Sequence, residues 1–223
     1  MGDTEIEWAD KVWNPVTGCT KISEDGKPHF SVRVHPERLE EPLKWKKPQR
    51  IFVCSMGDLF HEDVQWNWLD GMFSTMYHAP QHTYLILTKR PQAAFDYFNS
   101  PRISGSVRKT NEFLTDNLWL GVTVENQQAA DERIPILLQI PAVKRFISIE
   151  PMLSEIKFSA DFQLLDLCIV GGETGPKARP MHPDWARSVR DQCQAAGVPF
   201  FFKQMSKKEP IPEDLTIREW PKA

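Results

Sequence analysis

The chain has 223 residues, of which 41% are hydrophobic and 26% are charged, the composition of an ordinary globular protein with a sizeable core. Its 27 lysine and arginine residues stand against 30 aspartate and glutamate residues, and the net charge of -3 excludes a general electrostatic attraction to nucleic acid or anionic membranes. A nucleic-acid site would therefore have to be local. The length suits one large α/β domain, and we expect a single domain over residues 1–223.

The N-terminal residues MGDTEIEWAD are acidic and lack the basic start and apolar stretch of a signal peptide. No segment approaches the roughly 18 consecutive apolar residues of a membrane span, so we expect no membrane partner. The four cysteines are far apart, and three of them lie in apolar or helical runs where free buried thiols are common. Together these features predict a cytoplasmic protein.

Six short apolar runs recur along the chain, and each ends in a polar cluster. They are continuous rather than alternating, which is typical of strands buried on both faces. The predicted strands cover residues 51–55, 84–88, 118–123, 145–149, 167–170 and 199–203.

Helical patterns lie between these strands, at residues 62–79, 92–98 and 184–196. The repeated order of strand then helix predicts parallel strands with right-handed crossovers. Both a (β/α) barrel and an open doubly wound sheet satisfy this pattern, and in both of them ligands bind at the carboxyl ends of the strands. Residues 100–117 are expected to form a loop over that face, and residues 205–223 a polar tail with one edge strand.

The first predicted strand ends in Ser55, Gly57, Asp58 and His61. A glycine there lets the backbone approach a ligand, and the polar side chains can bind hydroxyls, amines or a metal. The alternative is that Asp58 or His61 only caps the following helix.

The second predicted strand ends in Thr88, Lys89 and Arg90, immediately before a helix. Two cations beside a helix N-terminus are expected of a corner that binds a carboxylate or a phosphate. A structural salt bridge to an acid on a neighbouring strand is the alternative interpretation.

The third and fourth strands end in acids, Thr123 with Glu125 and then Glu150, and the last strand ends in Lys203. Charges of both signs at neighbouring strand ends indicate either a zwitterionic ligand or an internal network of ion pairs. Glu150 is the better functional candidate of the two acids, because the proline after it holds its backbone extended. An acid–base enzyme would use Glu125 or Glu150 as general base beside Lys89 or Lys203.

The fifth strand runs into the sequence GGETGPKAR, which contains Gly171, Gly172, Glu173 and Arg179. The glycines predict a tight turn with exposed amides, to which Glu173 and Arg179 add charge. The spacing is not that of a dinucleotide-binding fingerprint. The alternative is a glycine-rich connector that binds no ligand.

Eight ordered sequence blocks together resemble a phage-associated protein family of unknown function, distantly similar to spore photoproduct lyase and other radical S-adenosylmethionine enzymes. The blocks are IEWADKVWNPVTGCTKIS, HPERLEEPLKWKKP, IFVCSMGDLFHEDV, LTKRP, LWLGVTVENQQAADERIP, RFISIEPML, IVGGETGPKARPMHPDW and QCQAAGVPFFFKQ. The resemblance covers nearly the whole chain. It implies a partial (β/α)6 barrel of the radical-SAM type, a TIM-like architecture with parallel strands.

The resemblance also implies a [4Fe-4S] cluster held by three cysteines after an N-terminal strand, the first of them Cys19. The second and third cysteines of that motif are not in this sequence, where the region over residues 1–40 is shortened after Ile22 and Ser23. Two readings follow. Either the protein is a cluster-free member, or the segment that carries those cysteines is missing from the sequence.

With the cluster, the implied function is reductive cleavage of S-adenosylmethionine by an enzyme whose substrate is unassigned, with a nucleotide or nucleic acid as a candidate. By position, the residues from Ser55 to Asp58 match the site for the methionine amine, and Gly171, Gly172 and Glu173 form a further binding motif. Lys89, Arg90 and residues 100–117 are the phosphate contacts that this reading predicts. Without the cluster, the rival hypotheses are an inactive barrel that binds a nucleotide or nucleic acid and the acid–base enzyme described above.

Overall fold

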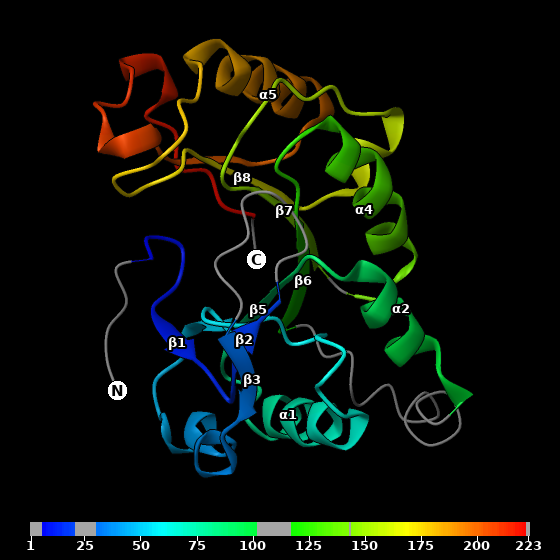
Figure 1. Ribbon diagram of the computed structural model, residues 1–223. Coiled ribbons are helices and arrows are strands. Elements are labelled where there is room, and N and C mark those ends of the chain that lie inside the picture. The colour runs from blue at the N-terminus through cyan, green and yellow to red at the C-terminus, as the bar shows by residue number, and fades with distance from the viewer. Residues whose placement is uncertain (1–5, 21–29, 102–116, 143, 222–223) are drawn as a thin grey trace. The chain divides into compact units, whose positions relative to one another are not determined.

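A computed structural model describes residues 6–20, 30–101, 117–142 and 144–221. Hydrogen bonds join seven of the described strands into one sheet, and two further strands form an antiparallel pair (Figure 1). In sheet order, the seven are β1 (Lys11–Trp13), β4 (Arg50–Val53), β5 (Thr83–Thr88), β6 (Leu118–Thr123), β7 (Lys144–Ile149), β8 (Leu167–Gly171) and β9 (Phe200–Gln204). The antiparallel pair is β2 (Val16–Cys19) with β3 (Phe30–Val34).

The order of the strands in the sheet is their order along the chain, and the pairs β1/β4, β4/β5, β7/β8 and β8/β9 are parallel. A doubly wound sheet reverses its strand order at a switch point, whereas a (β/α) barrel does not. The topology is therefore that of a partial barrel, and the predicted α/β class with parallel strands is confirmed. The apolar runs form these strands because almost every residue in β6, β7 and β8 is buried.

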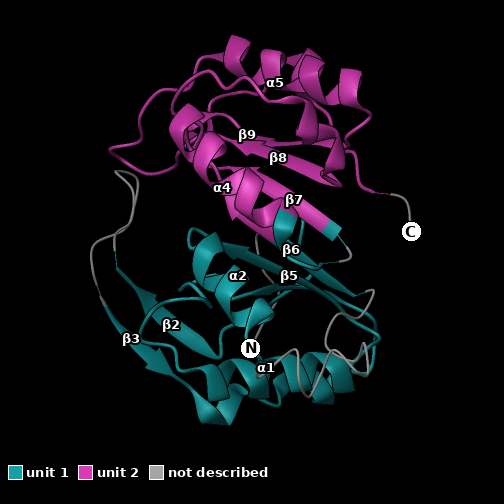
Figure 2. Ribbon diagram, turned by 90° about the vertical axis from the view of Figure 1, so that its right-hand side faces the viewer, with its two compact units in different colours: residues 1–120, 139–144 teal, residues 121–138, 145–223 magenta. Residues whose placement is uncertain are grey.

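The chain divides into two compact units, which Figure 2 colours teal and magenta. Unit 1 comprises residues 1–120 and 139–144, and unit 2 comprises residues 121–138 and 145–223. The prediction of one domain over the whole chain stays a prediction.

The described helices are α1 (Trp66–His78), α2 (Pro91–Asn99), α4 (Gln127–Gln139) and α5 (Pro183–Ala196), with short 3-10 turns η1 (Pro36–Arg38), η2 (Glu41–Lys44), η3 (Ala160–Leu164), η4 (Ser206–Lys208) and η5 (Glu213–Leu215).

All six predicted strands are present within one or two residues of their expected bounds. The sequence did not predict β1 or the β2/β3 pair from periodicity, because these strands are only three to five residues long. It also did not predict α4, whose interior contains Pro135 and several polar residues. The loop expected at residues 100–117 lies almost entirely outside the described residues.

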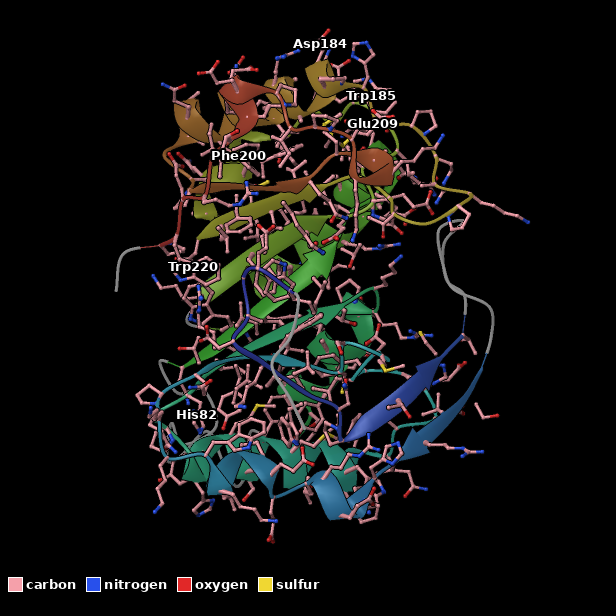
Figure 3. The ribbon with its side chains drawn as sticks, turned by 90° about the vertical axis from the view of Figure 1, so that its left-hand side faces the viewer. His82, Asp184, Trp185, Phe200, Glu209 and Trp220 are labelled. Carbon is pink, nitrogen blue, oxygen red and sulfur yellow. The ribbon has the colours of Figure 1, made fainter. Side chains whose placement is uncertain are left out.

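At the amino end of β5, unit 1 buries His82, whose position Figure 3 labels. Its Nε2 lies 3.1 Å from the carbonyl oxygen of Pro42 and donates to it, since a carbonyl can only accept. Its Nδ1 has no hydrogen-bond partner within the described part of the chain. Burial lowers the pKa of His82 below its usual value of 6.5, so the imidazole is neutral at pH 7.

In unit 2, residues of the C-terminal tail cover the outer edge of β9. Phe201 and Arg218 form an antiparallel bridge, and the amide of Phe202 donates to the carbonyl of Ile217 at 2.9 Å. The guanidinium of Arg218 also lies over the Phe201 ring, 5.0 Å from its centre. The edge strand expected in the tail is therefore present as a single bridge.

No helix among the described residues has both the length and the apolar character needed to cross a membrane.

Candidate functional site

At the carboxyl ends of β4 and β5 in unit 1, the carboxylate of Asp58 is almost completely buried and accepts four hydrogen bonds. The Thr88 hydroxyl and the Phe60 amide donate to Oδ1, at 2.7 and 3.0 Å. The Lys89 amide and the Arg90 guanidinium donate to Oδ2, at 3.0 and 3.2 Å. Because each oxygen already accepts two hydrogen bonds, Asp58 is poorly suited to bind the amine of a ligand.

The guanidinium of Arg90 links the end of β5 to the end of β2. Besides Asp58, it donates to the Thr20 hydroxyl at 2.7 Å and lies 3.5 Å from the Cys19 sulfur. The Cys19 thiol donates in turn to the Thr20 carbonyl at 3.2 Å. Of the two interpretations of this corner, the structural salt bridge is the one that the contacts favour, since Arg90 is engaged within the protein.

His61 completes this network from the loop after β4. Its Nδ1 lies 3.1 Å from the Asp63 amide nitrogen, and its Nε2 lies 2.9 Å from the Thr20 hydroxyl and 3.3 Å from the Thr20 amide nitrogen. Burial, followed by the positive charge of Arg90, lowers the pKa of His61 below its usual value of 6.5. His61 is therefore a neutral imidazole held between two protein groups at pH 7.

These buried histidines make the stability of the fold depend on pH. Below pH 6.5 the unfolded chain protonates His61 and His82, while the native state, in which both pKa values are lowered, resists protonation. We expect the free energy of unfolding to fall on acidification from pH 7 to pH 5, by at most about 1.4 kcal/mol per pH unit for each histidine.

Urea denaturation at several pH values measures this dependence. The variants His61→Gln and His82→Gln should each flatten it, whereas replacement of the exposed His78 by glutamine should leave it unchanged. An equal pH dependence in all four proteins would contradict the assignment.

The remaining predicted residues of unit 1 shape the loop after β4. The Ser55 hydroxyl donates to the Asn14 side chain at 3.2 Å. Gly57 forms a parallel bridge with Gly18, and a Cβ at Gly57 would lie 2.9 Å from the Gly18 carbonyl oxygen. Gly57 is thus required for close contact between two backbone segments and not for the approach of a ligand.

In unit 2, the carboxylate of Glu125 is buried after β6 and pairs with Arg133 of α4. Nη1 of Arg133 donates to Oε2 of Glu125 at 2.7 Å and to the Thr123 carbonyl at 2.6 Å. The side chains of Glu125 and Arg133 are only 1% and 10% exposed. Such a buried pair anchors α4 to the end of β6, and it leaves Glu125 inaccessible as a general base.

The second pair of unit 2 joins the ends of β7 and β9. Nζ of Lys203 donates to Oε1 of Glu150, and the two side chains are 18% and 22% exposed. Between their strands lies β8, which ends in Gly171. A Cβ at Gly171 would lie 3.5 Å from both the Glu150 carboxyl carbon and Lys203 Cβ, so the pair lies directly against this glycine. This carboxylate–ammonium pair is partly accessible to solvent.

The glycine-rich turn follows Gly171, which lies against the Glu150–Lys203 pair. Gly172 exchanges hydrogen bonds with Gln204, at 2.8 and 3.0 Å. The carboxylate of Glu173 accepts from the Arg179 amide and from two guanidinium nitrogens, at 2.8 to 3.0 Å. Glu173 and Arg179 are about a quarter to a third exposed, so this second pair also reaches solvent.

Each acid predicted at a strand end therefore pairs with a base within the described chain. Two pairs are nearly buried and two are partly exposed. The exposed ones, both in unit 2, are Glu150–Lys203 and Glu173–Arg179. We define these four residues with Gly171 and Gly172 as the β7–β9 site, the part of the predicted set that is most open to a ligand.

The cysteines of the chain do not suit an iron–sulfur cluster, which needs three thiolates here. Burial raises the pKa of Cys54 to about 12. In unit 2, burial and a hydrogen bond to Cys193 raise the pKa of the Cys168 thiol. Only Cys19 is partly exposed. No group of three His, Cys, Asp or Glu side chains in the described ranges could hold a metal ion.

Several contributing residues were not predicted, among them Thr20, Arg133 and Gln204. Thr20 follows Cys19 directly, but only the fold brings it to Arg90 and His61. Arg133 lies within α4, eight residues beyond Glu125, in a helix that the sequence pattern did not indicate. Only a clear helical pattern over residues 127–139 could have pointed to Arg133 as a partner of Glu125.

The strand order defines an α/β protein of the partial-barrel class, with charged residues at the ends of its strands. A family model described as a protein of unknown function (DUF5131) matches residues 26–213, and the chain belongs to this family. The matched range contains the whole β7–β9 site and begins after Cys19. No curated protein and no solved structure matches the chain.

Proposed function

We propose that this protein binds a small ligand bearing both a cationic and an anionic group at the β7–β9 site, and that it works without an iron–sulfur cluster. The observation that carries the proposal is the partly exposed pair of Glu150 and Lys203 above Gly171. A carboxylate accepts hydrogen bonds from an ammonium group, and an ammonium group donates to a carboxylate or phosphate. A zwitterion can therefore replace the internal pair with two bonds of the same kind.

S-adenosylmethionine is the first ligand to test, because its amino-acid end carries both charges and the resemblance to radical-SAM enzymes implies it. Glu150 and Glu173 suit the amine, and Lys203 and Arg179 suit the carboxylate. S-adenosylmethionine supplies methyl or adenosyl groups in the enzymes that use it. A nucleotide or nucleic acid is a second class of ligand in this proposal, since the same cations suit a phosphate.

Isothermal titration calorimetry with S-adenosylmethionine and with methionine tests the binding proposal. Glu150→Gln and Lys203→Met should each weaken binding by about tenfold to a hundredfold, because each removes a charge-assisted hydrogen bond of about 1.5–3 kcal/mol. Asp214→Asn is the matched control, because it breaks a surface ion pair with Arg187 elsewhere in unit 2. Unchanged affinity in both site variants, or no binding by the wild type, would refute the proposal.

Anaerobic reconstitution with iron and sulfide tests the proposal that the protein works without an iron–sulfur cluster. We expect no stoichiometric iron and no visible charge-transfer absorption, because one partly exposed cysteine cannot replace three ligands. About four iron atoms per chain would show that the protein does assemble a cluster.

Acid–base catalysis is a second candidate function, favoured by the direct hydrogen bond between Lys203 and Glu150. In this reading Glu150 takes a proton from a bound substrate and Lys203 returns one. Exchange of the α-proton of amino acids with deuterium from solvent, followed by NMR, is a suitable assay. Exchange that persists in Glu150→Gln would exclude this role for Glu150.

A further inference from the structure

The turn η4 (Ser206–Lys208), here called the lysine turn, follows β9 directly and lies against the β7–β9 site. Its backbone packs on Gly172: a Cβ there would lie 2.2 Å from the Ser206 amide nitrogen. The Lys207 amide donates to the Glu173 carbonyl at 2.9 Å, and the Glu209 amide donates to the Ser206 carbonyl at 3.0 Å. These contacts attach the turn to the loop that carries Glu173.

The lysine turn has an unusual backbone for its residue types. Lys207 and Lys208 have φ angles of 56° and 59°, in the left-handed region that residues with a Cβ rarely adopt. Two successive residues of this kind are maintained here by the hydrogen bonds to Glu173 and Ser206. The turn therefore presents its two lysines from a fixed backbone.

A buried hydroxyl lies in the same turn. Ser206 is 2% exposed, and its Oγ has no hydrogen-bond partner among the described residues. Leaving a buried donor unsatisfied is unfavourable, and such groups commonly mark the place of a water molecule, an ion or a ligand. Ser206 thus offers a hydrogen-bond donor that the protein itself does not use.

The charges around the lysine turn favour an anion. Within the described chain, Lys207 and Lys208 form no ion pair, and both are exposed. Glu150 and Glu173 of the adjoining site are already paired with Lys203 and Arg179, so they do not neutralise the two lysines. The residue directly after the turn is Glu209, labelled in Figure 3. Among the described residues, no ion pair neutralises the two lysines.

We infer that the lysine turn binds a phosphate group of the ligand, with Lys207 and Lys208 supplying charge and Ser206 a hydrogen bond. This inference rests on the proposed function, because it assigns the anionic end of the ligand at the β7–β9 site. The ligand class is then a phosphorylated amine, such as a phosphoamino acid, or a nucleotide. Lysine binds phosphate as a point charge and needs no single orientation, which suits both classes.

Isothermal titration calorimetry at constant ionic strength, with inorganic phosphate, O-phosphoserine, AMP and methionine, tests the inference. The double variant Lys207→Ala plus Lys208→Ala should bind the three phosphates at least about tenfold more weakly. Lys46→Ala plus Lys47→Ala is the matched control, since these are also two consecutive exposed lysines and belong to unit 1. Ser206→Ala should leave the stability of the free protein unchanged or higher and still weaken phosphate binding by about threefold or more.

The probes separate the two proposals. Methionine carries no phosphate, so its affinity should fall in Glu150→Gln but stay at the wild-type level in the double lysine variant. If methionine binds and phosphate compounds bind equally to wild type and double variant, the lysine-turn assignment is wrong while the proposed function stands. If phosphate binding depends on the lysines but neither methionine nor S-adenosylmethionine binds, the proposed zwitterion site is wrong instead. Absence of phosphate binding by the wild type also overturns the assignment.

Discussion

Replacement of Asp58 by asparagine is expected to lower the free energy of unfolding by about 3–5 kcal/mol, the usual cost of removing one partner from a buried ion pair. The Asp58 carboxylate is 6% exposed and accepts four hydrogen bonds. An asparagine amide places an NH2 group where two donors already point. The variant also leaves the Arg90 guanidinium without its acid.

Urea denaturation measures this effect, and Asp63→Asn is the matched control. Asp63 lies in the same loop, but its side chain is 67% exposed, so its replacement should change stability by no more than about 0.5 kcal/mol. A small effect of Asp58→Asn would mean that the carboxylate is not the structural centre of this corner. The predicted role of Asp58 in binding a ligand would then have to be reconsidered.

Replacement of Gly172 by alanine is expected to cost about 3 kcal/mol or more, at or above the upper end of the range for overpacking. The new Cβ would lie 2.2 Å from the Ser206 amide nitrogen and 2.7 Å from the Met205 carbonyl carbon. Both atoms belong to the backbone, so they cannot move aside as the end of a flexible side chain can. The lysine turn would have to separate from the end of β8.

Gly171→Ala provides the comparison for that prediction. Its Cβ would make ordinary contacts at 3.5 Å with Glu150 and Lys203, so the expected change in stability is within about 1 kcal/mol. The two variants differ by one position in the sequence, and urea denaturation can compare them directly. Equal stability of the two would contradict the close packing of Gly172 on the lysine turn.

The sequence predicted the strands and the polar residues at their ends because both signals are local. Continuous apolar runs indicate buried strands, and the polar cluster after each run indicates the strand end. The parallel sheet follows from the repeated strand–helix order, although the choice between barrel and doubly wound topology required the strand order itself.

The partners of these residues could not be predicted in the same way. Glu150 and Lys203 are 53 residues apart, and they meet because β7 and β9, at whose ends they lie, are on either side of β8. For Arg90 the sequence left open an external anion and a structural salt bridge, and the fold brings it to Asp58, Thr20 and Cys19. Pairing of this kind depends on the positions of side chains from distant segments, which residue type and spacing do not determine.

We expect the tail residues that cover β9 to protect the protein from aggregation. Without the segment that holds Ile217 and Arg218, the amide groups of β9 would form an open sheet edge rich in phenylalanine. Such an edge is a template for pairing with a second chain. Proteolytic loss of this short segment would thus turn a well-packed protein into one that associates with its own copies.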